Sequence, residues 1–206
     1  MKKFFSNTRM MCTGAMLAAI AAVLMFLDFP LPFLPSFYKI DFSELPVLIG
    51  AYAMGPVAGV VIEAFKILVK FIIKGTSTAG IGEVANFLMG LAFILPASIM
   101  YQVKKNKKSA ITGLAIGTVA CVIAGCLLNA YVLLPAYVKF SSYIPDMDSI
   151  ISSGTKVNSH ITGLTSFLLL ATAPLNLIKC VSVSVITVLI YKPLSRIIKG
   201  NSNPNK

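Results

Sequence analysis

The 206-residue sequence has few of the residues that carry out catalysis, with one histidine and only seven acidic residues. The single histidine, His160, lies in a polar connector without a neighbouring cysteine or carboxylate, so it predicts neither a zinc site nor a catalytic triad. Asp146 and Asp148 lie in a loop with proline and serine and are interpreted as solvated. We therefore expect no catalytic residues, no metal site and no enzyme activity.

A nucleotide-binding loop is also missing. The nearest glycine-rich candidate, residues 75–80, is followed by Ile81, where a phosphate-binding loop needs a lysine. The cysteines lack the paired spacing of a metal site or a disulfide framework and are interpreted as small apolar fillers. They are Cys12, Cys121, Cys126 and Cys180. The sequence shows no internal repeat, low-complexity linker or second domain, so we expect one membrane domain over residues 1–206.

Long apolar runs fill most of the chain, which is 57% hydrophobic and 12% charged. Most runs reach the ~20 residues that a helix needs to cross hydrocarbon. The run from Leu45 to Ile73 is too long for one span, and Gly55-Pro56 divides it, because proline disfavours helical geometry in the residue before it. The sequence predicts an all-α integral membrane bundle of six transmembrane helices, at about 10–27, 44–54, 56–73, 82–103, 109–134 and 163–191.

Basic residues gather at 2–9, 104–108 and 192–199. Positively charged connectors stay in the cytoplasm, so an even number of crossings must separate these clusters. Six helices satisfy this condition and place both termini in the cytoplasm. A cleavable signal peptide ending near residues 19–21 is an alternative, but its removal would leave an odd number of crossings. The net charge of +11, mostly on this side, indicates anionic lipid as a partner and argues against nucleic acid.

Several polar residues fall within the apolar runs, where burial of a charge needs a partner. Glu63 and Lys66 are three residues apart and predict a same-helix ion pair, extended by Lys70 and Lys74 towards the outer surface. Lys179 lies deep in the last span without an acidic residue within one turn. Its partner must therefore come from another helix or from a ligand.

The connector at about 28–43 is external by the charge argument. Together with Glu44 it contains three prolines, five aromatic residues and three carboxylates, which is more than a simple link needs. We interpret it as a lid loop over an opening in the bundle. An amphipathic loop lying at the membrane interface is the alternative.

Small residues form a strip on the first helix. Gly14, Ala18 and Ala22 are four residues apart, and Ala15 and Ala19 run beside them. Such a strip lets another helix approach closely. It serves either packing inside the bundle or docking to another protein.

The segments at 38–46, 55–56, 63–66, 82–86 and 174–179 resemble the riboflavin-binding S components of energy-coupling factor (ECF) transporters. The likeness covers nearly the whole chain. It implies a prokaryotic plasma-membrane protein that binds riboflavin near the external face, beneath the first loop. It also implies docking through Ala15, Ala18, Ala19 and Ala22 to a transmembrane T protein that carries two cytoplasmic ATPases. Riboflavin would be the transported ligand, and no cofactor is expected.

A riboflavin pocket needs ring and aliphatic walls together with a few hydrogen-bonding groups. Two other functions remain open: an S component for a different vitamin, and a stand-alone facilitator, although the chain has neither a repeated half nor a ring of pore charges. The predicted substrate-binding residues are Phe33, Leu34, Tyr38, Asp41, Glu83, Asn86, Asn129, Asn176 and Lys179, with Phe37 as a further wall residue.

Overall fold

The computed structural model describes residues 7–35, 37–76, 78–140 and 146–199, with side chains described as far as Tyr191. Six helices make up the body of the molecule. They are α2 (Thr8–Phe26), α3 (Glu44–Met54), α4 (Pro56–Lys74), α5 (Ile81–Val103), α6 (Lys107–Leu128) and α10 (Ala173–Lys199).

Two of the long helices contain a π-helical segment. Helix α6 continues through η1 (Asn129–Leu133) into α7 (Leu134–Phe140). Likewise, α9 (Leu164–Phe167) continues through η2 (Leu168–Thr172) into α10. The short helix α8 (Met147–Thr155) lies in the connector between them, where Asp146 caps its first turn by accepting a hydrogen bond from the Ser149 backbone N–H at 2.7 Å. Asp146 was predicted to be solvated in a loop, and its position as a helix cap was not predicted.

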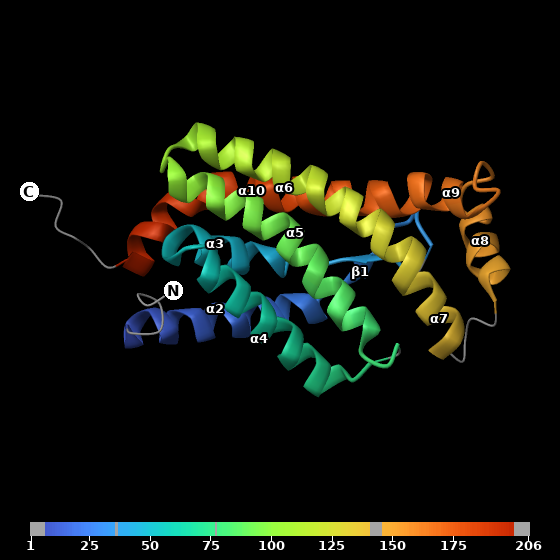
Figure 1. Ribbon diagram of the computed structural model, residues 1–206, viewed down its shortest axis with the longest axis horizontal. Coiled ribbons are helices and arrows are strands. Elements are labelled where there is room, and N and C mark those ends of the chain that lie inside the picture. Colours follow the sequence, from blue (N-terminus) through green and yellow to red (C-terminus); the bar gives the residue numbers. More distant parts are fainter. Residues whose placement is uncertain (1–6, 36, 77, 141–145, 200–206) are drawn as a thin grey trace, which may run out of the picture.

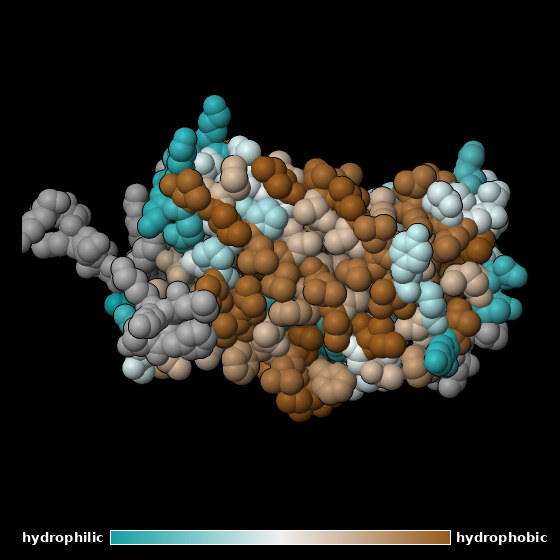
Figure 2. Space-filling model, in the orientation of Figure 1, coloured by the Kyte–Doolittle hydropathy of each residue, from teal (hydrophilic) through white to brown (hydrophobic). Residues whose placement is uncertain are grey.

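The long segments run back and forth along the longest axis of the molecule (Figure 1). The start of α2, the turn between α3 and α4, the connector between α5 and α6 and the end of α10 lie at one end. The connector between α4 and α5, together with α7, α8 and α9, lies towards the other end. Apolar side chains cover most of the middle, and hydrophilic ones gather at the two ends (Figure 2).

Among the described residues, four helical stretches are long and apolar enough to cross a membrane. Helix α3 has 11 residues and extends about 16 Å, roughly half of the hydrocarbon thickness. Helix α4 is long enough to span but carries Glu63 and three lysines. The four stretches are Thr8–Phe26, Ile81–Val103, Lys107–Phe140 and Leu164–Tyr191.

The predicted break at Gly55-Pro56 is confirmed. Helix α3 ends at Met54 and α4 begins at Pro56. Gly55 has φ +106°, a conformation that favours glycine because it has no Cβ. Proline fits the first turn of α4, where its missing N–H leaves no helical hydrogen bond unmade.

The connector before α3 folds back into the bundle. Strands β1 (Phe29–Pro30) and β2 (Lys39–Ile40) form an antiparallel pair within it, a hairpin that the all-α prediction did not include. After the hairpin the chain turns inward, and Ile40 and Asp41 are buried. Ser43 is buried as well, so the end of the predicted lid loop is part of the interior.

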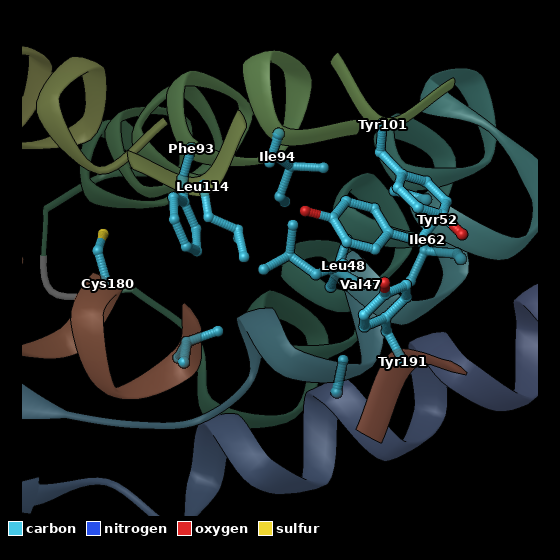
Figure 3. Close-up of a cluster of buried hydrophobic side chains, with 14 of the residues drawn as sticks. Val47, Leu48, Tyr52, Ile62, Phe93, Ile94, Tyr101, Leu114, Cys180 and Tyr191 are labelled. Atoms are coloured by element: carbon cyan, nitrogen blue, oxygen red, sulfur yellow. The ribbon is translucent and has the colours of Figure 1, made fainter. Parts of the chain in front are cut away.

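The apolar core joins α2, α3, α4, α5, α6 and α10. Three tyrosines close one side of it (Figure 3). Tyr52 and Tyr101 are stacked with ring centroids 4.5 Å apart, and Tyr191 meets both rings edge-on. The Tyr52 hydroxyl donates to the Ala110 carbonyl at 3.3 Å, which satisfies its polar end. This core fixes the helices that carry the site.

Candidate functional site

A cavity of about 430 Å³ lies between the β1–β2 connector, α4, α5, η1 and α10. This volume is within the range of small-molecule sites, roughly 300–1,000 Å³. The structure brings together seven of the nine predicted substrate-binding residues around it. They are Tyr38, Asp41, Glu83, Asn86, Asn129, Asn176 and Lys179.

The other two predicted residues do not line this cavity. Phe33 is 53% exposed, and Leu34 is buried in a separate apolar cluster with Phe167. Phe37 lines the cavity instead, and its ring stacks on that of Phe167 with centroids 6.3 Å apart. The α8–α9 region, far along the chain, decides which aromatic residues of the loop face inward. Tyr137 also lines the cavity and had no signal in the sequence.

The Tyr38 hydroxyl joins the loop to two helices. It donates to Asn129 Oδ1 at 3.0 Å and lies 2.7 Å from Thr172 Oγ1. All three residues are buried. Burial raises the pKa of the Tyr38 phenol above its ordinary value, so the group stays protonated and able to donate.

Lys179 has a partner, as predicted, but its nearest one is Asp41 of the loop, whereas a residue of another helix or a ligand was expected. Lys179 Nζ lies 3.0 Å from Asp41 Oδ2 and 3.9 Å from Glu44 Oε1. Lys66 continues the series, with its Nζ 2.9 Å from Glu44 Oε1 and 2.7 Å from Glu63 Oε2. The five charges alternate in sign from α4 to the loop, which offsets much of the cost of burying them. The predicted Glu63–Lys66 ion pair is therefore confirmed.

Burial opposes ionisation of Asp41, but neighbouring groups outweigh it. The ammonium groups of Lys179 and Lys66 and the hydrogen bond from the Ser43 backbone N–H hold the pKa of the Asp41 carboxyl at about 2. The carboxylate therefore remains charged at neutral pH. It anchors the end of the loop to α10.

The predicted extension of the ion pair through Lys70 and Lys74 was wrong. Lys70 Nζ lies 2.9 Å from Glu83 Oε1 on α5, and Lys74 Nζ lies 3.5 Å from Asp28 Oδ2 in the connector. The end of α4 faces these two elements, so its lysines pair with residues outside α4. Glu83 also accepts a hydrogen bond from Thr76 Oγ1 at 2.8 Å.

The cavity provides ring faces, three amides and several ion-paired side chains, which suit the binding of a polar molecule with a flat apolar portion. In the part of the chain that the structure describes, no three histidine, cysteine or acidic side chains are grouped as metal ligands. His160 lies on the surface, where its ring Nδ1 is 3.2 Å from Asn158 Oδ1. The lining of the cavity fits the binding of a small molecule.

A second, apolar groove of about 500 Å³ lies between α2 and α4. All four alanines of the strip on α2 line it. Ala18 and Ala22 are buried, whereas Ala15 and Ala19 are exposed. Half of the strip therefore packs inside the bundle, and half forms the floor of an open groove. Phe65 of α4 stands on the other wall and is 54% exposed.

Comparison with known families decides the identity. Residues 9–191 match the model of the family described as "ECF transporter, substrate-specific component". The chain belongs to this family. Its members are transporter components, in agreement with the prediction that the chain is not an enzyme. The predicted resemblance to ECF S components is confirmed.

Similar proteins extend over most of the S component's length. The riboflavin transporter RibU of Staphylococcus aureus is 35% identical over 196 residues, covering 94% of each chain. The riboflavin transporter FmnP of Bacillus subtilis is 37% identical over 179 residues, covering 86% of this chain and 87% of its own. A solved S component of a bacterial ECF transporter matches with a TM-score of 0.69 and 34% identity, over 93% of this chain and 98% of that one. The predicted all-α membrane fold agrees with this match.

Proposed function

We propose that this S component binds riboflavin from the external side of a bacterial plasma membrane. It delivers the vitamin through a partner module composed of a transmembrane T protein and two cytoplasmic ATPases. The observation that carries the proposal is the cavity beneath the loop, in which Tyr38, Asn129, Asn176 and Lys179 converge. Two of the similar proteins carry the name riboflavin transporter.

The chemistry of the cavity fits riboflavin, a flat ring system with a neutral polyhydroxyl chain. Phe37, Tyr38 and Tyr137 provide ring surface, and Asn129 and Asn176 provide donors and acceptors. Lys179 lines the cavity and keeps 16% of its side chain exposed. A hydrogen bond from a charged group contributes about 1.5–3 kcal/mol, more than a neutral one.

The proposed topology has six transmembrane helices with both termini in the cytoplasm, in one domain over residues 1–206. Its support is the arrangement in Figure 1, where the start of α2, the basic 104–108 connector and the end of α10 share one end of the molecule. Positive connectors favour the cytoplasmic side. Loop residues and Thr78 of the α4–α5 connector line the cavity, and this connector lies towards the opposite end, which is then external.

The groove between α2 and α4 is the proposed docking surface for the T protein. Ala15 and Ala19 leave room there for an approaching helix, and apolar side chains line the walls. The sequence contains no phosphate-binding loop, so energy must come from the partner ATPases.

Uptake of labelled riboflavin tests this function. We expect accumulation in a bacterium without its own riboflavin uptake only when the S component and the T protein–ATPase module are produced together. Unlabelled riboflavin should compete, whereas pantothenate and biotin should not. Uptake without the module would indicate a stand-alone facilitator, and no uptake of labelled riboflavin with the module present would indicate a different substrate.

A further inference from the structure

Thr172 lies behind the cavity and contacts the residues that line it. It is the last residue of η2, its side chain is fully buried, and it is not among the lining residues. Its Oγ1 lies 2.7 Å from the Tyr38 hydroxyl, and its main-chain carbonyl accepts a hydrogen bond from Asn176 Nδ2 at 2.9 Å. One residue outside the cavity thus contacts two cavity-lining side chains.

The donors and acceptors of the hydrogen bonds around Tyr38 can be assigned in only one way. Asn129 Nδ2 donates to the Gly125 carbonyl at 2.8 Å, so the Asn129 Oδ1 is the acceptor for the Tyr38 hydroxyl at 3.0 Å. A phenol has a single hydrogen to donate. The Thr172 hydroxyl must therefore donate to Tyr38, which donates to Asn129.

This order determines what the cavity offers a ligand. The Tyr38 hydroxyl hydrogen is used by Asn129, so Tyr38 presents its ring to the cavity. Among the described residues, only the Gly125 carbonyl accepts from the Asn129 amide, so Asn129 has a second amide hydrogen to donate. Asn176 uses one amide hydrogen on the Thr172 carbonyl and keeps its Oδ1 as an acceptor.

We propose that Thr172 is a positioning residue, which holds Tyr38 and Asn176 directly, and Asn129 through Tyr38, in the geometry that binds substrate. The inference rests on the proposed riboflavin-binding function. It adds a residue that does not touch the ligand.

The π-helical segments explain how Thr172 reaches this place. In η2 the Ala173 N–H donates to the Leu168 carbonyl, five residues back, and in η1 the Leu134 N–H donates to the Asn129 carbonyl in the same way. Such a segment inserts one residue into a helical turn and is frequent at functional sites. Asn129 begins one segment and Thr172 ends the other, and both turn towards Tyr38.

The test compares riboflavin binding by purified variants. Thr172→Val keeps the shape and removes the hydroxyl, so we expect affinity to fall roughly three- to tenfold, as for one lost buried hydrogen bond, mainly through faster dissociation. Thr172→Ser restores the hydroxyl and should bind within about twofold of the parent. Thr187→Val is the matched control, because Thr187 is a buried threonine of α10 whose Oγ1 has no hydrogen-bond partner within the described part of the chain. Its affinity should match that of the parent.

A double-mutant cycle separates positioning from general stability. In a Tyr38→Phe background, Thr172→Val should weaken binding by less than about twofold, because the bond it removes is already gone. An equal loss in both backgrounds, or parental affinity of Thr172→Val, would overturn the inference. The same four proteins can be compared by thermal unfolding without ligand, which tests the Tyr38–Thr172 hydrogen bond independently. If the losses of stability in the two single variants add up in the double variant, the bond is refuted. Failure of the parent itself to bind riboflavin would refute the proposed function instead.

Discussion

Replacing Lys179 with methionine tests how the cavity and the loop are held together. Lys179 Nζ lies 3.0 Å from Asp41 Oδ2 and 3.9 Å from Glu44 Oε1. Methionine keeps much of the stem volume and removes the charge. The variant leaves three buried carboxylates, on Asp41, Glu44 and Glu63, with Lys66 as the remaining ammonium of the series.

The structure predicts loss of stability in addition to loss of affinity. Removing one partner of a buried ion pair costs about 3–5 kcal/mol, because the other charge stays buried and unpaired. The Lys179 and Asp41 side chains remain 16% and 11% exposed, so water screens the stranded carboxylate in part. We therefore expect the lower end of the range, about 3 kcal/mol, in the protein without ligand.

Thermal unfolding of the purified protein in detergent, without riboflavin, measures this effect. The control is the double variant Lys179→Met with Asp41→Asn, which removes both charges. We expect it to recover more than half of the lost stability, because no stranded carboxylate remains on the loop. A riboflavin titration of the same proteins should show roughly ten- to hundredfold weaker binding when Lys179 is replaced.

Two results would refute this reasoning. If Lys179→Met unfolds at the parental temperature while riboflavin binding weakens, Lys179 serves the ligand and does not hold the loop. If Asp41→Asn brings no recovery in the Lys179→Met background, Asp41 is not the charge that Lys179 neutralises.

Three further predictions concern docking, pH and the cavity wall. Ala19→Trp should fill the α2–α4 groove and abolish uptake while leaving riboflavin binding in detergent intact; Ile20→Trp, at an exposed position outside the groove, is the control, and equal uptake by both variants would refute docking there. Because the folded-state pKa of Asp41 is lowered to about 2, its contribution of about 2 kcal/mol is complete above the ordinary value of 3.8 and disappears as pH falls towards 2. Titration of Asp41 should therefore not change the thermal stability between pH 5 and 8. If the difference in unfolding temperature between the parent and Asp41→Asn changes across this interval, the lowered pKa is contradicted. Phe37→Ala should weaken riboflavin binding at least about tenfold, since burying a phenylalanine contributes about 1.5–3 kcal/mol, whereas Phe33→Ala should bind like the parent; the reverse order would place the wrong ring in the cavity.

The helices could be predicted from sequence because their signals are local. Apolar length and the Gly55-Pro56 pair place most helix ends within a few residues of the observed ones. The hairpin of β1 and β2 and helix α8 were not predicted. Both depend on contacts with residues far along the chain, such as the cluster that Leu34 and Ile150 form with Phe167.

The need for partners in the membrane was predictable, but the partners were not. Burial in an apolar span requires Lys179 to have a counter-charge, whichever residue supplies it. Asp41 is 138 residues away in sequence, and only the fold brings the two together. The same limit explains Lys70 and Lys74, which pair with Glu83 of α5 and Asp28 of the connector.

The visible absorption spectrum of the protein tests the central claim most directly. The protein should be purified from cells grown with riboflavin, washed free of unbound vitamin, and then titrated with riboflavin after removal of any bound ligand. The account predicts a protein that carries a flavin absorption band and quenches riboflavin fluorescence on titration, with one site per chain. A colourless protein that leaves the fluorescence of added riboflavin unchanged would contradict it.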